Sequence, residues 1–130
     1  MKRVALAIVG AAFGLAAGAS AQQKDSLPPG VTAAMVTEGE KLFKGAGLCS
    51  ACHGADAKGM PGVGANLTDS EWNYSKGTYD DIVKQVLSGV PPEKSKTGAV
   101  MPPKGGSQLT DAQVKAVAAY VWTLSHSKKK

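Results

Sequence analysis

The stretch Cys49-Ser50-Ala51-Cys52-His53 holds both cysteines of this 130-residue chain and places a histidine directly after the second one. Two residues separate the thiols, so both can react with the same group, and the His53 imidazole follows on the same turn. This C-x-x-C-H spacing is typical of haem c attachment, in which each thiol adds to one vinyl group and the histidine binds the iron. We therefore expect one haem c, tethered by Cys49 and Cys52, with His53 as the proximal ligand.

Three other interpretations compete with haem attachment. A structural zinc site needs four ligands, and beyond the motif the chain offers only His126, while His53 is too close to Cys52 to share one ion comfortably. A thioredoxin-like dithiol lies in a βαβ pattern, and no strand alternation flanks this motif. A plain disulfide leaves the adjacent histidine unexplained. Haem attachment accounts for all three residues.

The composition indicates one small domain with a modest core. Apolar residues make up 43% of the chain but aromatic residues only 5%. A covalent haem would add apolar surface to this core, and each Å² removed from water stabilises the fold by about 25 cal/mol. The formal charge of +5 falls to +3 without Lys2 and Arg3. No basic stretch is interleaved with aromatic residues, so we expect no nucleic-acid partner.

The first residues have the pattern of an export signal. The basic start Met1-Lys2-Arg3 precedes an uncharged run to Ala21 that ends in small residues. This pattern predicts a signal peptide over 1–21, cleaved before Gln22, and therefore a periplasmic protein. The alternative is an uncleaved membrane anchor, because about 18 apolar residues can just span a bilayer. Residues 22–31 then form a flexible arm, and residues 32–130 form the domain.

Four later stretches carry helical signals, either an apolar stripe or a Thr-x-x-Glu/Gln/Asp start. They are 32–44, a short segment that begins at 68 and carries Trp72 and Tyr74, 78–88 with Gly89 as C-cap, and 110–125. Glycine-rich and proline-rich loops separate these stretches. Gly39 interrupts the first one, where glycine costs about 1 kcal/mol relative to alanine, which hints at a close helix contact. The pattern predicts an all-α fold.

A sixth iron ligand must come from a segment that can reach the other face of the haem. The candidates are Met35, Met60, Met101 and His126. Met60 is so near His53 that its loop would have to be almost fully extended, and Met35 lies on an amphipathic helix. Met101 lies far along the chain, in a loop stiffened by two following prolines and with little else to bury. We therefore expect Met101 to be the distal ligand.

With these residues the chain resembles class I cytochromes c, small all-α monohaem electron carriers, from about Val36 to Leu124. The resemblance implies a cytochrome c fold of three to five helices around one covalently attached haem c. The matching residues are Gly39 and Phe43 on the first helix, Tyr120 on the last, the motif Cys49, Cys52 and His53, the haem-packing Leu67, and Met101 as distal ligand. Asn66-Leu67-Thr68-Asp69, with Trp72, Tyr74 and Met101-Pro102, is most similar to small bacterial cytochromes and to the cytochrome c domains of cbb3-type oxidase subunits.

One position departs from the family pattern. Many members have proline where this chain has Ala65, and the carbonyl of that residue accepts the second ring N–H of the haem histidine. Alanine keeps the carbonyl, so we expect the hydrogen bond in a less rigid loop.

His/Met ligation saturates the iron, which implies outer-sphere electron transfer and no enzyme activity. We expect a monomeric carrier between a membrane reductase or periplasmic dehydrogenase and a terminal oxidase or reductase. The alternatives are a haem subunit of an oxidase, dehydrogenase or sulfur-oxidising complex, and an open-site haem enzyme or gas sensor. Lysines in the segments expected to frame the haem edge would steer docking. They are Lys44, Lys58, Lys94, Lys96 and Lys104.

Overall fold

The computed structural model describes residues 26–72 and 75–127. Within them lie α1 (Ala33–Lys44), α2 (Ser50–His53), α3 (Tyr79–Ser88) and α4 (Asp111–His126), with two short 3-10 helices, η1 (Pro92–Lys94) and η2 (Pro103–Gly106). The expected all-α fold is confirmed. The predicted signal peptide over 1–21, the first residues of the predicted arm, Tyr74 and the last three lysines lie outside the described residues.

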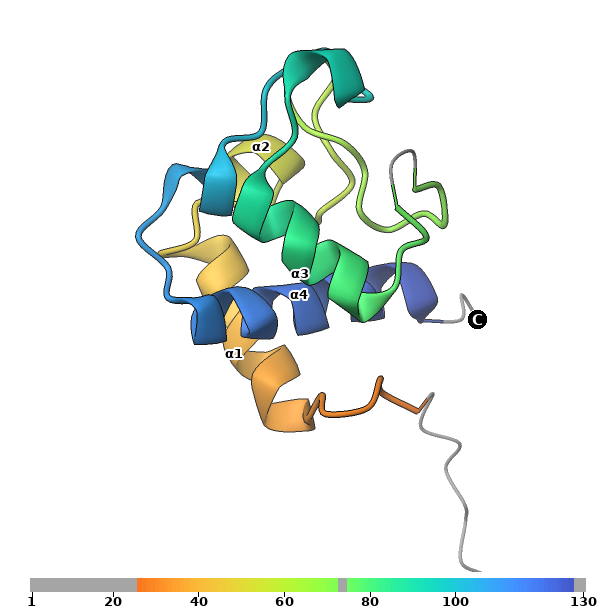
Figure 1. Ribbon diagram of the computed structural model, residues 1–130, viewed down its shortest axis with the longest axis vertical. Coiled ribbons are helices and arrows are strands. Elements are labelled where there is room, and N and C mark those ends of the chain that lie inside the picture. The colour runs from red at the N-terminus through yellow and green to blue at the C-terminus, as the bar shows by residue number, and fades with distance from the viewer. Residues whose placement is uncertain (1–25, 73–74, 128–130) are drawn as a thin grey trace, which may run out of the picture.

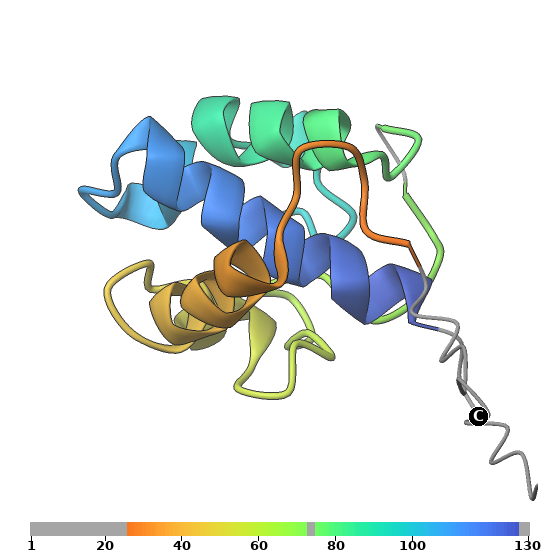
Figure 2. The ribbon, with the colours of Figure 1, turned by 90° about the horizontal axis from the view of Figure 1, so that it is seen from below.

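Helix α4 forms the centre of the molecule. Figure 2 shows it running between α3 on one side and α1 on the other, and both helices pack against it. Its buried face is apolar, and Val114, Val117 and Val121 are almost fully covered. Helix α2 and the long loops lie together at one end of this arrangement (Figure 1). The helices α1, α3 and α4 therefore form the packed core, and α2 and the loops cover one end of it.

The predicted helix starts are present in three of four cases. Thr32 and Thr78 accept hydrogen bonds from backbone N–H groups in the first turns of α1 and α3. Thr110 and Gln113 form a full capping box at the start of α4: each side chain accepts from the other residue's backbone N–H, at 3.3 and 2.9 Å. Such caps stabilise a helix by about 1 kcal/mol each. The boundaries predicted for these helices are therefore confirmed to within a residue or so.

The crossing of α1 and α4 explains the glycine inside the first helix. A Cβ atom at Gly39 would lie 2.6 Å from the carbonyl carbon of Ala116 and closer still to its oxygen. One turn later the Phe43 and Tyr120 rings meet edge to face, with centroids 5.4 Å apart. Phe43 is fully buried. The close contact expected from Gly39 is therefore confirmed.

The helix predicted to begin at Thr68 is wrong. The Asn66 side chain accepts the Thr68 backbone N–H at 2.8 Å, and Asp69 accepts that of Glu71 at 3.1 Å. These two local turns use the backbone donors that a helical start would need, so residues 67–70 form successive bends. Trp72 is half-buried and packs against the core from this irregular segment.

The described residues of the predicted arm include a turn directly before α1. Val31 is buried, and its N–H donates to the carbonyl of Pro28 at 3.0 Å, which closes a turn before α1. Of the helices among the described residues, none is long and apolar enough to cross a bilayer.

Candidate functional site

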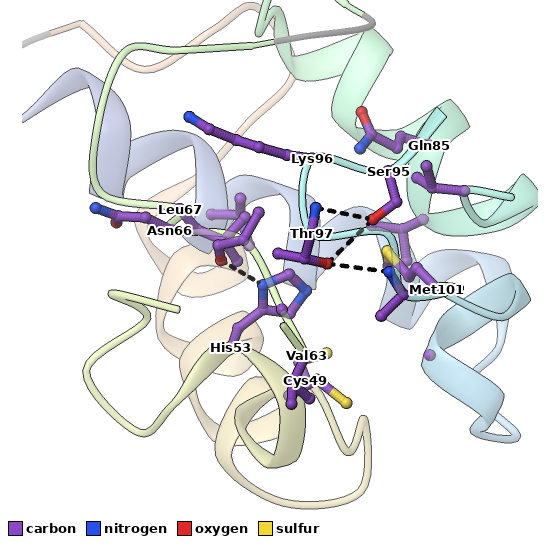
Figure 3. A pocket seen from close by; sticks show the side chains of 18 of the residues that line it. Cys49, His53, Val63, Asn66, Leu67, Gln85, Ser95, Lys96, Thr97 and Met101 are labelled. Carbon is purple, nitrogen blue, oxygen red and sulfur yellow. Dashed lines mark hydrogen bonds between the residues drawn. The ribbon is translucent and has the colours of Figure 1, made fainter. Parts of the chain in front are cut away.

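A large cleft lies between α2, the buried faces of α3 and α4, and the loop that carries Met101. It contains about 1270 Å³ of empty space, part of it open to solvent. Cys49, Cys52, His53 and Met101 all line it, although Met101 lies far from the motif in sequence. Figure 3 shows the His53 ring projecting from α2 into this space, with Met101 on a separate loop. The cleft therefore gathers every residue that the sequence predicted for the site.

The floor of the cleft is the apolar core itself. Side chains from three helices contribute to it, which makes most of the lining hydrophobic. They are Phe43, Ile82, Val86, Val117 and Val121. Leu67 also lines the cleft, as expected for a haem-packing residue. An apolar, largely planar group would fit such walls, because its burial removes both surfaces from water.

Helix α2 is one turn long and depends on its neighbours for its position. Gly64 lies directly against it, and a Cβ there would be 2.6 Å from the carbonyl carbon of Cys52 and 3.1 Å from the His53 nitrogen. The His53 carbonyl accepts the Gly59 N–H at 2.8 Å. The loop that follows the motif therefore wraps back onto it, and this fixes the direction of the histidine.

The His53 ring is held by the carbonyl of Ala65. Its Nδ1 lies 2.7 Å from that oxygen, so Nδ1 carries the proton and donates, leaving Nε2 available to a ligand in the cleft. The hydrogen bond expected at Ala65 is thus present without the usual proline. Burial lowers the pKa of His53, which favours the neutral imidazole, while the bond to Ala65 acts in the opposite direction. A neutral imidazole is the form that binds a metal.

The two cysteines are free thiols, with Cys49 partly buried and Cys52 exposed. Cys49 donates to the carbonyl of Gly47 at 3.3 Å, and burial raises the pKa of its thiol. No disulfide joins them. Among residues 26–72 and 75–127, no group of three or more His, Cys, Asp or Glu side chains is placed to hold a metal ion. The residues fit a covalent haem: two thiols and an imidazole open onto one apolar cleft.

The other candidates for the sixth ligand lie elsewhere. Met60 is 41% exposed and pairs with Gly64 in a short backbone bridge. Met35 is half-buried on α1. His126 is exposed at the end of α4 and stacks on Trp122, with ring centroids 4.2 Å apart. Of the four candidates, only Met101 lines the cleft.

The lysines expected to frame the haem edge divide into two groups. Lys94 and Lys96 line the cleft, and Lys58 joins Lys96 at a shallow hollow beside it. Lys44 lies outside the cleft lining and pairs with Glu40 on α1, and Lys96 pairs with Glu71 at the same distance, 2.6 Å.

Lys104 turns away from the cleft. Its ammonium donates to the Leu109 carbonyl and to Asp111, both at 2.9 Å, and its side chain is only 30% exposed. It therefore fastens the start of α4, and the expectation that it frames a docking surface is not supported by its position.

Several cleft residues were missed in the sequence. Gln85 comes from α3, while Ser95 and Thr97 lie in the loop before Met101. The Ser95 and Thr97 hydroxyl groups lie 3.1 Å apart. Residue type alone gave no signal for them, because isolated serine, threonine and glutamine are common in any exposed loop or helix. Their place in the site arises from how the loop folds back.

Comparison with known proteins decides the family. The family model described as cytochrome C oxidase, cbb3-type, subunit III matches residues 34–121, more than half of the chain. This chain belongs to that family. The matched residues run from the start of α1 into α4, to residue 121, and include every residue that lines the cleft. The resemblance to cbb3-type cytochrome c domains is thereby confirmed, and with it the c-type cytochrome character of the domain.

Curated relatives agree with this assignment to the cbb3-type cytochrome family. The chain is 42% identical over 67% of its length to cbb3-type cytochrome c oxidase subunit CcoP of Rubrivivax gelatinosus, and covers 25% of that protein. It is 39% identical to CcoP of Rhodobacter capsulatus, with 70% of this chain and 30% of that one covered. The chain therefore spans less than a third of the length of these relatives.

A solved structure shows the same fold. A crystal structure of cytochrome CL from the marine methylotrophic bacterium Methylophaga aminisulfidivorans MPT superposes with a TM-score of 0.54 and 25% sequence identity. The match covers 70% of this chain and 53% of that one. The expected cytochrome c fold is confirmed by this likeness.

Proposed function

We propose that this chain is a monohaem c-type cytochrome that carries single electrons between redox proteins. Cys49 and Cys52 would hold the haem through two thioethers, and His53 and Met101 would be its axial ligands. The observation that carries the proposal is the convergence of these four residues on one apolar cleft. When bound, the haem supplies a one-electron couple between ferrous and ferric iron.

The residues of the cleft have separate tasks. His53 presents Nε2 because Ala65 holds Nδ1. The Met101 thioether favours the reduced state and raises the reduction potential relative to a second histidine. With His53 and Met101 as its two ligands, the haem iron would offer substrates and gases no coordination site, so we propose an electron carrier and not an enzyme. The apolar floor excludes water, which keeps the reorganisation of the surroundings small when the charge changes.

Partners would dock at the open edge of the cleft. Lys94 and Lys96 line the cleft and Lys58 lies beside it, with Lys96 already paired to Glu71 at 2.6 Å. An acidic partner surface would therefore complement Lys94 and Lys58. We propose a membrane reductase or periplasmic dehydrogenase as donor and a terminal oxidase or reductase as acceptor, met by a monomeric carrier in the periplasm. Electron-transfer encounters of this kind bury less than about 1,200 Å².

A permanent subunit of a larger complex is the second candidate. It is favoured by one observation: the curated relatives are named as subunits of a cbb3-type oxidase. Purification from the source organism separates the two functions. A subunit co-purifies with a catalytic chain through several columns, whereas a carrier elutes alone from the periplasmic fraction.

The optical spectrum of the protein, produced with a haem c maturation system, tests the ligand set. We expect a weak methionine-to-iron charge-transfer band in the far red of the ferric form, lost in Met101→Ala. Met60→Ala is the matched control, since Met60 is exposed and lies outside the cleft lining, and it should keep the band. A haem protein that lacks the band, and binds carbon monoxide readily when ferrous, would contradict the proposal and favour an open-site enzyme or sensor.

A further inference from the structure

The backbone of Met101 is joined to the end of α3 by two hydrogen bonds. The Val90 N–H donates to the Met101 carbonyl at 2.8 Å, and the Met101 N–H donates to the Val90 carbonyl at 2.9 Å. This pair is an isolated antiparallel bridge. Val90 and Met101 both line the cleft. The methionine therefore leaves a fixed point of backbone, although it lies in a segment without regular structure.

Gly89, directly before the bridge, leaves no room for a side chain. A Cβ there would lie 2.8 Å from the Pro103 nitrogen and 2.9 Å from the Pro102 carbonyl carbon, and closer still to the Met101 carbonyl oxygen. All three are backbone atoms, so rotation of a side chain cannot relieve the contact. Gly89 also has φ of +72°, and its N–H caps α3 by donating to Gln85. The Met101 segment thus rests directly on the glycine.

Helix α3, which Gly89 caps at its C-terminal end, is held in place by the core. Helix α3 buries Ile82, Val83 and Val86 against the core and packs on α4. A methyl group at position 89 would therefore displace the Met101 loop and leave the helix in place, because the loop has fewer buried contacts.

We propose that Gly89 is a positioning residue for Met101: it lets the Met101 backbone lie against the end of α3 and so sets how far the thioether reaches into the cleft. The inference rests on the proposed function, in which Met101 is an axial ligand. A side chain at position 89 would displace the Met101 backbone, and with it the sulfur that would bind the haem iron. Weaker ligation follows, and an added ligand then competes more easily for the sixth position.

The experiment compares Gly89→Ala with Gly98→Ala in the haem-loaded protein. Gly98 also has a positive φ, +75°, but nothing lies within 4 Å of a Cβ there. Both variants place a side chain at a positive φ, at Gly89 with ψ of −173° as well, but only the first also brings the side chain against the Met101 backbone. The readouts are the far-red band of the ferric form, the reduction potential and the affinity for imidazole as an added iron ligand.

We expect Gly89→Ala to keep covalent haem, to lose most of the far-red band, to have a lower potential and to bind imidazole roughly tenfold more tightly or more. Gly98→Ala should match the wild type in all three. A Gly89→Ala protein with the full band and wild-type imidazole affinity overturns the inference. If both Gly89→Ala and Met101→Ala keep the far-red band, Met101 is not the ligand and the proposed function is contradicted. If Gly89→Ala keeps the band and Met101→Ala loses it, only the positioning role of Gly89 is contradicted.

A measurement on the unaltered protein keeps the inference testable if Gly89→Ala does not fold. Amide hydrogen exchange should be slow at Val90 and Met101, whose N–H groups form the bridge. It should be much faster at Lys96, an exposed residue of the same loop whose N–H makes no hydrogen bond with a described residue. Equal, fast exchange at all three would mean that the bridge does not hold the loop, which overturns the proposal.

Discussion

Replacing Gly39 with alanine tests the contact on which the helical base depends. The new methyl group would lie 2.6 Å from the carbonyl carbon of Ala116 and 3.0 Å from the Tyr120 Cβ. Carbon atoms in contact are normally about 3.5–4.0 Å apart. Since the nearest obstacle, the Ala116 carbonyl oxygen, is backbone of α4, the two helices must separate by more than about 1 Å, which also loosens the Phe43–Tyr120 contact.

Two opposing effects determine the size of the change. Overpacking of a close contact typically costs about 1–3 kcal/mol, and a contact against backbone belongs at the upper end. Alanine gains about 1 kcal/mol of helix propensity over glycine. The net expectation is a loss of about 2 kcal/mol in the free energy of unfolding. For a domain of this size, such a loss lowers Tm by roughly 8–16 °C.

Thermal unfolding of the haem-loaded protein, followed by far-ultraviolet circular dichroism, measures this change. Glu38→Ala is the matched control, because Glu38 is the exposed neighbour on the same helix and its replacement should change stability by no more than about 0.5 kcal/mol. The reasoning is refuted if Gly39→Ala is as stable as the wild type or more stable. That result would mean that helix propensity dominates and that α1 and α4 do not cross closely at this residue.

Two further predictions concern charge. The rate of oxidation by hexacyanoferrate(III), an anionic acceptor, should fall with rising salt, and it should fall less steeply in a Lys58→Gln/Lys94→Gln double variant. Lys115→Gln is the control, because Lys115 lies exposed on α4 outside the cleft lining. Equal dependence of the rate on salt in the two variants would contradict electrostatic steering. The Lys96 ammonium, hydrogen-bonded to Glu71 at 2.6 Å, holds the pKa of that carboxyl below its usual value. The pair therefore stabilises the fold above the pKa that Glu71 has in the unfolded chain, and this stabilisation is lost as pH falls through the pKa of Glu71 in the folded protein. Lys96→Gln should raise the pKa of Glu71 in an NMR titration, and an unchanged pKa would show that the pair does not persist in solution.

The parts of the fold that follow from local chemistry were predictable from sequence. Helices α3 and α4 begin at threonines whose hydroxyl groups cap the first turn, and a hydroxyl at that position has the same effect in any context. Thr68 shows the limit of this argument. Its cap pattern is intact, but Asn66 and Asp69 compete for the same backbone donors, and their turns form instead of the helix.

The site was predictable where its chemistry depends on spacing along the chain. The motif residues lie within one turn, so the link between Cys49 and His53 needs no tertiary information. The role of Lys104 was not accessible in this way. Its ion pair with Asp111 depends on a backbone in the left-handed region, with φ of +55°, which residue type does not predict for lysine. The Val90–Met101 bridge likewise joins residues whose pairing no local pattern encodes.

The Val90–Met101 bridge also closes a loop at its base. The residues between them, including η1, extend from a point already secured by two backbone hydrogen bonds, and Lys96 of this loop pairs with Glu71 outside it. Because the entropic cost of a longer closed loop grows only slowly with its length, insertions at the exposed residues 91–93, which lie outside the cleft lining, should be tolerated as long as the bridge and the lining residues after them are kept. Residues 91–93 are therefore a natural place for variation during evolution, and for grafting a recognition sequence, without changing the lining of the cleft.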